Sequence, residues 1–363
     1  MNFFEDAFSG RTVLVTGHTG FKGSWLSLWL TDLGAKVVGY ALPPDTTPSL
    51  FNQLELAQSV DSRIGDIRDA VLLEKTLRET RPEVVFHLAA QPLVRESYER
   101  PAETFAVNAL GTANLLDAVR RAGSVKACLV ITTDKCYENP ENGRAFREDD
   151  RLGGRDPYSA SKACVELIVA SYRAAFFSSP GAASVASARA GNVIGGGDWA
   201  KDRLLPDCVR SLAAGRPVSV RNPKSVRPWQ HVLEPLSGYL RLAARQLAEP
   251  ARHAEAWNFG PQPGRALSVG EVTKLAVKVW GSGSWLAAPE DPAAPHEAGQ
   301  LYLDSTKAEQ KLGWLPVYGA AEAVERTIAW YLAAREPGFD ARGFTMRQIA
   351  EYAVSARGAE TRR

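Results

Sequence analysis

The sequence lacks the features that mark several large protein classes. Its 363 residues contain few cysteines, and none of them forms a C-x-x-C pair. The five histidines are not spaced as metal ligands. These absences argue against a disulfide-rich secreted scaffold and give no sign of a metal site, so we expect reduced thiols and a cytoplasmic protein. The four cysteines are Cys128, Cys136, Cys164 and Cys208.

Long apolar runs and an excess of either charge are also missing. The opening stretch, MNFFEDAFSGRTVLVTG, carries acidic residues before a short strand, so we expect neither a signal peptide nor a membrane span. The 43 basic and 41 acidic side chains give a net charge of +2, which offers no reason to expect a nucleic-acid partner. An apolar content of 45% is sufficient for a sizeable core and argues against wholesale disorder.

Short β-branched runs alternate with longer amphipathic helical patterns through the first half of the chain. This alternation predicts an α/β fold, a Rossmann-type doubly wound parallel sheet with helices on both faces. Helical patterns occupy residues 22–34, 101–123 and 157–176. The expected strands lie within residues 11–17, 36–42, 61–69, 82–90, 126–133 and 183–195.

The second half has a different character. Residues 192–207 are rich in glycine and polar side chains and predict a long loop. Short strands and helices follow, which indicates a smaller mixed α/β substrate domain. We expect residues 1–188, with roughly 228–260 interleaved, to form the larger Rossmann-type domain, residues 189–227 and 261–340 the smaller substrate domain, and residues 341–363 a C-terminal helix and tail.

Three glycines, Gly17, Gly20 and Gly23, lie between the first strand and the first helix. Glycines let the backbone turn tightly and approach a pyrophosphate at the helix N-terminus, so the loop predicts a dinucleotide site. The acidic ribose anchor usually lies at the end of the second strand. Asp45 is the near candidate there, and it follows two prolines and is better explained as a solvated turn residue, so this position leaves NAD and NADP both open.

Tyr158 and Lys162 are four residues apart and share one face of a predicted helix. A charged lysine favours the phenolate of a neighbouring tyrosine, and that phenolate can take a proton from a substrate hydroxyl. Tyr-x-x-x-Lys is common by chance, but here it follows a five-strand nucleotide-binding pattern. Thr133, at the end of the fifth strand, can supply a companion hydroxyl.

Several long strings resemble the extended short-chain dehydrogenase/reductase superfamily and, within it, the CDP-glucose 4,6-dehydratase family. They are VTGHTGFKGSWL, HLAAQPLVRESY, TTDKCYEN, DPYSASKA, AGNVIGGGDWAKDRLLPD, RNPKSVRPWQHVLEPLSGYL, WNFGP and PHEAGQLYLDSTKAEQKLGW. The likeness extends from about residue 8 to about residue 335. It implies an NAD-dependent lyase that oxidises the sugar at C4, eliminates water across C5 and C6 and returns hydride to C6. The cofactor-binding residues that we predict are Gly17, Gly20, Phe21, Gly23, Asp66, Ile67, Leu88, Ala89, Ala90, Gln91, Asn108, Tyr158 and Lys162.

This reaction would explain the adjacent Asp134 and Lys135 at the mouth of the fifth strand. Elimination needs an acid for the C6 hydroxyl and a base for the C5 proton, in addition to the Tyr–Lys pair. Asp134 suits the acid. The dTDP-glucose dehydratases carry Asp-Glu at the matching place, whereas Asp-Lys matches the CDP-glucose enzymes. Lys135 can be the base if it loses its proton, or it can stay charged and stabilise the enolate.

The resemblance also implies a set of substrate-binding residues in the second half. Arginine presents a planar fork that matches phosphate oxygens. Base specificity for cytosine follows from the resemblance and from no physical argument. The predicted substrate-binding residues are Asn192, Arg203, Arg221, Arg227, Asn258 and His296.

Two other functions remain possible at this stage. A 4-epimerase or reductase of the same superfamily would share the fold and the Tyr–Lys pair but would not need the acid–base pair. A non-catalytic nucleotide sensor would not need Thr133, Tyr158 and Lys162. The helical segments 101–122 and 157–178 carry apolar positions beyond one core face, so we expect a homodimer or homotetramer.

Overall fold

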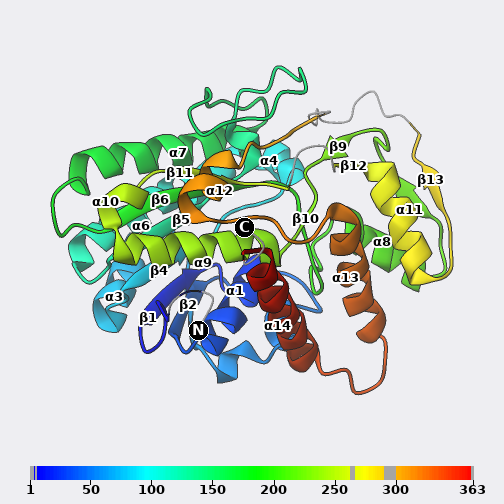
Figure 1. Cartoon of the computed structure of the whole chain (residues 1–363), viewed down its shortest axis with the longest axis horizontal. Coiled ribbons are helices and arrows are strands. Elements are labelled where there is room, and N and C mark those ends of the chain that lie inside the picture. The colour runs from blue at the N-terminus through cyan, green and yellow to red at the C-terminus, as the bar shows by residue number, and fades with distance from the viewer. Residues whose placement is uncertain (1–3, 5, 262–265, 290–299, 361–363) are drawn as a thin grey trace.

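The computed structural model describes residues 4, 6–261, 266–289 and 300–360. Its centre is a seven-stranded sheet in which all neighbouring strands are parallel (Figure 1). This arrangement confirms the predicted Rossmann-type fold, and the strand order reverses between β1 and β4, where such sheets bind ligands. In spatial order the strands are β3 (Asp61–Ile64), β2 (Lys36–Ala41), β1 (Thr12–Thr16), β4 (Val84–His87), β5 (Ala127–Ile131), β6 (Ser184–Ala190) and β11 (Ala256–Phe259).

Both faces of the sheet are covered, because successive side chains of each strand point to opposite sides. In β5, Leu129 packs into one apolar cluster and Val130 into the other. The first cluster includes α1 (Phe21–Asp32), α9 (Leu233–Ala248) and α14 (Ala341–Glu360). The second includes α3 (Ala70–Thr80), α6 (Gly111–Ala122) and α7 (Pro157–Phe176). The strands therefore read as continuous apolar runs, as buried parallel strands do.

The predicted helix over residues 101–123 has a wide turn in its middle. The segment comprises α5 (Pro101–Phe105), a π-helical turn η2 (Ala106–Leu110) and then α6. Such turns are frequent at functional sites because they redirect side chains. Here the turn contains Asn108, whose side chain is buried against the loop that follows β4.

The prediction of one long loop over residues 192–207 is partly wrong. Val193–Ile194 form β7, which pairs with β10 (Gln230–His231), and α8 begins at Leu204 and runs to Ala213. Apolar side chains of α8 are buried at helical spacing, and Pro206 lies in its first turn, where proline is tolerated. The glycine content of the preceding residues concealed this helix start.

The second half of the chain builds a smaller lobe beside the sheet. Figure 1 shows its helices α8, α11 and α13 grouped at one end of the molecule. One helix within residues 261–340, α12, instead contacts β11 and α9 of the larger lobe. The remaining elements are α2 (Leu50–Gln53), η1 (Leu56–Gln58), α4 (Val94–Glu99), η3 (Asp134–Cys136), β8 (Val218–Val220), β9 (Val226–Arg227), α10 (Pro250–His253), β12 (Leu267–Ser268), α11 (Val269–Trp280), β13 (Trp285–Ala287), α12 (Thr306–Leu312) and α13 (Ala320–Ala333).

A buried carboxylate joins the C-terminal helix to the rest of the fold. Glu234, at the start of α9, accepts hydrogen bonds from the backbone N–H groups of Val317 and Tyr318 and from the Tyr352 hydroxyl of α14. Burial raises the pKa of Glu234 to about 7, against the stabilising effect of these donors on the ionised form.

Glu234 should make the stability of the fold depend on pH near neutrality. Its folded pKa lies above its unfolded value, so its stabilising contribution is complete at acidic pH and is lost as pH rises through about 7. We expect unfolding free energy to fall by up to about 3 kcal/mol over this range relative to Glu234→Gln. Thermal unfolding from about pH 5 to pH 8 measures the difference. The exposed Glu325→Gln is the control, and parallel curves for wild type and Glu234→Gln would contradict the prediction.

No helix among the described residues is long and apolar enough to cross a membrane.

Candidate active site

A cavity of about 1180 Å³ lies between the two lobes. Its walls include the loops after β1, β2, β4, β5 and β6, together with β8 and the start of α8. This is the carboxyl edge of the sheet, where side chains from strands distant in sequence meet. Most of the predicted site residues line this cavity.

The glycine-rich loop forms a tight cradle at one end of the cavity. Gly17 has a positive φ of 74°, and a Cβ there would lie 2.7 Å from the Ala89 backbone nitrogen. A Cβ on Gly23 would lie 2.0 Å from the Gly17 carbonyl oxygen. Gly20 precedes α1 and has no side chain to cover the helix N–H groups. Phe21 also lines the cavity, and the cradle fits the pyrophosphate of a dinucleotide.

Replacing Gly23 by alanine should damage this cradle. The added methyl would overlap the Gly17 carbonyl, so the loop must move. We expect a lower melting temperature and an affinity for NAD that is reduced by about tenfold or more, since each 1.4 kcal/mol of strain costs tenfold. Calorimetric titration with NAD measures the loss. Gly319→Ala, where the new methyl meets nothing within 4 Å, should change neither property, and unchanged NAD binding in Gly23→Ala would refute the prediction.

The far end of the cofactor groove carries the predicted residues Asp66 and Ile67. Arg68 bonds both oxygens of Asp66, and this contact lowers the pKa of that carboxyl against the opposite effect of burial. Leu88, Ala89 and Ala90 form the adjoining wall. Asp45 is exposed, as the sequence indicates for a turn residue, and also borders the cavity.

Gln91 and Asn108 lie behind the cavity wall and are absent from its lining. The Asn108 amide accepts from the Gln91 backbone N–H at 2.8 Å and donates to the Gln91 carbonyl at 3.1 Å and to Ser161 Oγ at 2.8 Å. The structure therefore places this pair behind the cavity wall, where it supports the loop after β4 and the start of α7.

Thr133, Tyr158 and Lys162 meet at the mouth of β5. Burial raises the pKa of Tyr158 to about 12, although the neighbouring Thr133 side chain acts in the opposite direction. Lys162 donates to the Ile131 carbonyl at 3.2 Å, and burial lowers its pKa to about 8 although the nearby Glu166 carboxylate opposes this. An added positive charge beside this cluster would favour the phenolate.

Asp134 and Lys135 follow directly in η3 and face the same cavity. Asp134 is 1% exposed, and its Oδ1 accepts from the Thr133 hydroxyl at 3.0 Å. Lys135 Nζ lies 3.9 Å from the same oxygen, and its side chain is 24% exposed. Within the described chain, Asp134 Oδ2 is buried without a hydrogen-bond partner. The site thus holds a buried carboxyl with one oxygen available, next to an amine that reaches solvent.

On the opposite wall, the structure brings Asn192, Arg203, Arg221 and Arg227 to the cavity. Arg203 donates to Asp198 at 2.9 Å, and Arg221 donates to Asp202 at 3.3 Å. Asn192 Oδ1 is buried and has no partner among the described residues. This wall combines guanidinium groups with a free amide oxygen, which suits a polar anionic ligand.

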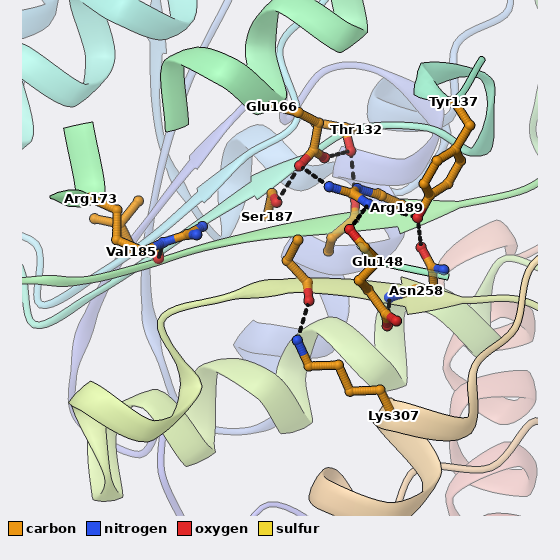
Figure 2. A network of polar contacts seen from close by, with 12 residues as sticks. Thr132, Tyr137, Glu148, Glu166, Arg173, Val185, Ser187, Arg189, Asn258 and Lys307 are labelled. Carbon is orange, nitrogen blue, oxygen red and sulfur yellow. Dashed lines mark hydrogen bonds and ion pairs between the residues drawn. The ribbon is translucent and has the colours of Figure 1, made fainter. Parts of the chain in front are cut away.

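Asn258 does not reach the cavity, which the substrate role predicted for it would require. Its oxygen accepts from the Tyr137 hydroxyl at 2.7 Å, as Figure 2 shows. Its amide nitrogen donates to the carbonyls of Phe146 and Asp304. All its polar atoms are thus used to hold loops together behind the cavity. His296 lies outside the described residues.

Sequence reasoning missed Lys22 and Arg95, which both line the cavity. Lys22 is half-buried in the glycine-rich loop, and desolvation, followed by the charge of Arg203, lowers its pKa to about 7. Arg95 Nε lies 4.0 Å from Asp202 Oδ1, and both residues line the cavity. The available signal was a cation within the glycine-rich loop, GFKGSW, for Lys22 and a cation directly after the short apolar run PLV for Arg95. No group of three or more potential metal-ligating side chains occurs in the described part of the chain.

Comparison with known proteins places these features in context. The family model described as GDP-mannose 4,6 dehydratase matches residues 14–327. A CDP-glucose 4,6-dehydratase of Salmonella typhimurium is 50% identical over 353 residues, which cover 96% of this chain and 98% of that protein.

Solved structures show the same architecture. The dTDP-glucose 4,6-dehydratase DesIV of Streptomyces venezuelae, solved with NAD, superposes with a TM-score of 0.76 at 26% identity and covers 89% of this chain and 98% of its own. A UDP-glucose 4-epimerase of Thermus thermophilus, also with NAD, gives a TM-score of 0.75 at 26% identity over 89% of this chain and 99% of its own. The fold is therefore common to dehydratases and epimerases, and the site residues must separate the two.

Proposed function

This chain belongs to the GDP-mannose 4,6 dehydratase family, and from that premise we propose that it converts CDP-D-glucose to CDP-4-dehydro-6-deoxy-D-glucose. The observation that carries this proposal is the pairing of Asp134 and Lys135 with Tyr158 and Lys162 in one cavity. The first pair suits loss of water, and the second suits oxidation of a hydroxyl. The 50% identical relative that acts on CDP-glucose supports cytidine as the nucleoside.

NAD is the cofactor of this nucleotide-sugar 4,6-dehydratase, as in the solved relatives. Gly17, Gly20 and Gly23 would hold its pyrophosphate, and Asp66 and Ile67 would border its adenosine. When bound, NAD accepts the hydride from C4 of the sugar and returns it to C6 after water has left.

Tyr158 is the base for the first step. Its hydroxyl is oriented by Thr133, and Lys162 one turn further along α7 supplies a positive charge that favours the phenolate. The phenolate removes the proton of the C4 hydroxyl, and the resulting ketone acidifies the hydrogen at C5. The same residues hold the C4 oxygen through the elimination.

Asp134 and Lys135 then perform the elimination. Asp134, with one oxygen bonded to Thr133 and the other available, delivers a proton to the C6 hydroxyl, and water leaves. A neutral Lys135 accepts the C5 proton and returns a proton to C5 when hydride reaches C6, and its partly exposed amine can exchange that proton with solvent in between. As a cation it would instead stabilise the enolate, and the geometry is compatible with both roles.

The opposite wall suits the sugar diphosphate. Arg203 and Arg227 would bind the diphosphate, and Arg221 and Asn192 would add polar contacts to the phosphate or nucleotide. The 4-epimerase reading shares the cofactor site and the Tyr–Lys pair, but it leaves Asp134 and Lys135 without a task, so we do not favour it.

We also propose that the protein is a homodimer or a larger assembly in the cytoplasm. Leu110 of η2 and Leu167 and Phe176 of α7 are exposed apolar side chains on the two helical segments that the sequence indicated for pairing. Large exposed apolar groups favour association. The four free thiols support a reducing compartment, and a 4-keto-6-deoxy product suits deoxysugar biosynthesis. A monomeric sedimentation profile would contradict the assembly.

An isotope experiment tests the proposed reaction. CDP-glucose with deuterium at C4 is incubated with the protein and catalytic NAD, and NMR and mass spectrometry locate the label. We expect deuterium at C6 of a 4-keto-6-deoxy product, because the cofactor returns the hydride that it took. Label that remains at C4 without a keto product rules out CDP-glucose as substrate, and repeating the test with other sugar nucleotides separates a different base from a different reaction.

A further inference from the structure

A buried ion pair lies directly beneath the catalytic cluster. Arg189 Nη2 of β6 is 2.8 Å from Glu166 Oε2 of α7, and the two side chains are only 4% and 2% exposed (Figure 2). Removing two charges from water costs several kcal/mol per ion, and a buried pair is often no more stable than apolar side chains of the same volume. Stability alone therefore does not explain why this ion pair lies behind the candidate active site.

The Glu166 carboxylate joins three elements of the site wall. Thr132, the residue after β5, donates its hydroxyl to Oε1, and Ser187 of β6 donates to Oε2 at 2.7 Å. Arg189 is held in turn by the Tyr137 hydroxyl, 2.6 Å from its Nη1, and by the Glu148 carbonyl at 3.0 Å. The carboxylate thus accepts a hydrogen bond or ion pair on each oxygen and is locked in one orientation.

Glu166 and its hydrogen-bond partner Thr132 are each close to a residue that we assign to catalysis. Glu166 lies one helical turn after Lys162 on α7, so the two side chains share a face of the helix. Thr132 immediately precedes Thr133, whose hydroxyl meets Tyr158. A displacement of Glu166 would change the electrostatic potential at the Lys162 amine. Through Thr132 and the end of β5, it would also move the Thr133 hydroxyl.

We propose that Glu166 is the positioning residue of this site: its carboxylate is the counter-charge that keeps Lys162 cationic, and through Thr132 it holds the end of β5 that carries Thr133. The catalytic part of this proposal rests on the function proposed above. Its electrostatic part concerns only how Lys162 holds its proton, and can be tested without turnover.

Of the two carboxyl groups in this cluster, Glu166 acts on Lys162, whereas Asp134 acts on Tyr158 and Lys22. The remaining neighbours of Lys162 cannot supply a negative charge near neutral pH. Burial lowers the pKa of His87 to about 3, so its ring is neutral, and burial raises the pKa of Cys136 well above its usual value, so its thiol is neutral. Burial raises the pKa of Tyr158 to about 12, and Lys22 can add only positive charge. Burial lowers the pKa of Lys162 to about 8 even with Glu166 beside it. Loss of the carboxylate charge would lower it further.

The test replaces the carboxylate by an amide. Glu166→Gln keeps an oxygen that can accept hydrogen bonds but removes the charge. The affinity for NAD is measured by calorimetric titration across the pH range, since Lys162 faces the cofactor groove, and the pH profile of kcat/KM is measured alongside. We expect the alkaline limb of both curves to move down by about one pH unit or more in Glu166→Gln. Ser187→Ala is the control, because it removes a hydrogen bond to the same carboxylate and no charge.

The pH of the alkaline limb in these variants either supports or overturns the role proposed for Glu166. A shifted alkaline limb in Glu166→Gln with an unshifted one in Ser187→Ala supports the proposal. An unshifted limb in Glu166→Gln, with at most a lower melting temperature, means that the pair is only structural and overturns it. If CDP-glucose is not the substrate, the NAD titration still reports on Lys162, so the two failures are distinguishable.

A second variant covers the case in which Glu166→Gln leaves Arg189 buried without a counter-charge and does not fold. The double change Glu166→Gln/Arg189→Met removes both charges and leaves neither unpaired. Because Glu166 lies one helical turn from Lys162 and its charge is removed together with that of its partner Arg189, we expect the alkaline limb to move to lower pH by less than in Glu166→Gln. A limb at the wild-type pH in this variant would also overturn the proposal.

Discussion

Tyr158→Phe should reduce turnover of CDP-glucose by roughly 10²- to 10⁴-fold, the usual contribution of a positioned general base. The change removes the hydroxyl that takes the C4 proton and leaves the ring. The phenol is buried beside Thr133 and Lys162, so no other residue at this position can replace it. The measurement is kcat by product NMR, with NAD affinity as the companion readout, and we expect that affinity to change little because the lysine remains.

Tyr172→Phe is the matched control for this prediction. Tyr172 lies on the same helix, α7, but is not part of the cavity wall, so the same loss of a hydroxyl should leave turnover near the wild-type value. Equal effects of the two changes would mean that the helix as a whole, and not the Tyr158 hydroxyl, is responsible. Wild-type activity in Tyr158→Phe would remove the tyrosine from the mechanism.

Asp134→Asn should separate oxidation from elimination. The amide can keep the hydrogen bond from Thr133 but cannot deliver a proton to the C6 hydroxyl. We expect dehydration to slow by roughly 10²- to 10³-fold while oxidation at C4 continues, so that the absorbance of the reduced cofactor builds up after mixing with substrate. Stopped-flow absorbance and quenched-flow mass spectrometry would follow the two steps separately.

Exchange of the C5 hydrogen with solvent separates the role of Lys135 from that of Asp134. In deuterated water, Asp134→Asn should still exchange the C5 hydrogen, because Lys135 is intact, whereas Lys135→Met should lose this exchange. Glu138→Gln, which removes another carboxylate at the same cavity, is the control and should change neither step. If Asp134→Asn shows no build-up of reduced cofactor and no slowing of water loss, Asp134 is not the acid.

Local sequence patterns were sufficient for the parts of the site that lie close together along the chain. The glycine-rich loop follows a strand and opens a helix, and its cradle geometry depends on backbone sterics within a few residues and on the neighbouring strand. Tyr158 and Lys162 share a helix face by their spacing, and Asp134 and Lys135 follow β5 by adjacency. In each case the position of the side chain is set mainly by the element that carries it.

Residues whose surroundings come from distant segments were not predictable in this way. Asn258 looked like a ligand residue, but the fold brings Tyr137, Phe146 and Asp304 to it, and together they use its side-chain amide completely. Gln91 and Asn108 pair with each other behind the wall, because a π-helical turn redirects the asparagine. The helix start at Leu204 was hidden by the glycine-rich residues before it, and the burial of its apolar face depends on packing within the smaller lobe.

The sequence by itself therefore determined the α/β class, the glycine-rich loop after the first strand and the placement of the two side-chain pairs to which we assign catalytic roles, since these follow from periodicity and short spacings. The tertiary structure alone decided which polar residues face the cavity and what charge surrounds them. Glu166 and Arg189 are 23 residues apart and meet only because α7 packs against β6, and burial at that contact converts an ordinary ion pair into the counter-charge of a catalytic lysine. Desolvation and long-range contact are properties of the folded chain, and no local pattern encodes them.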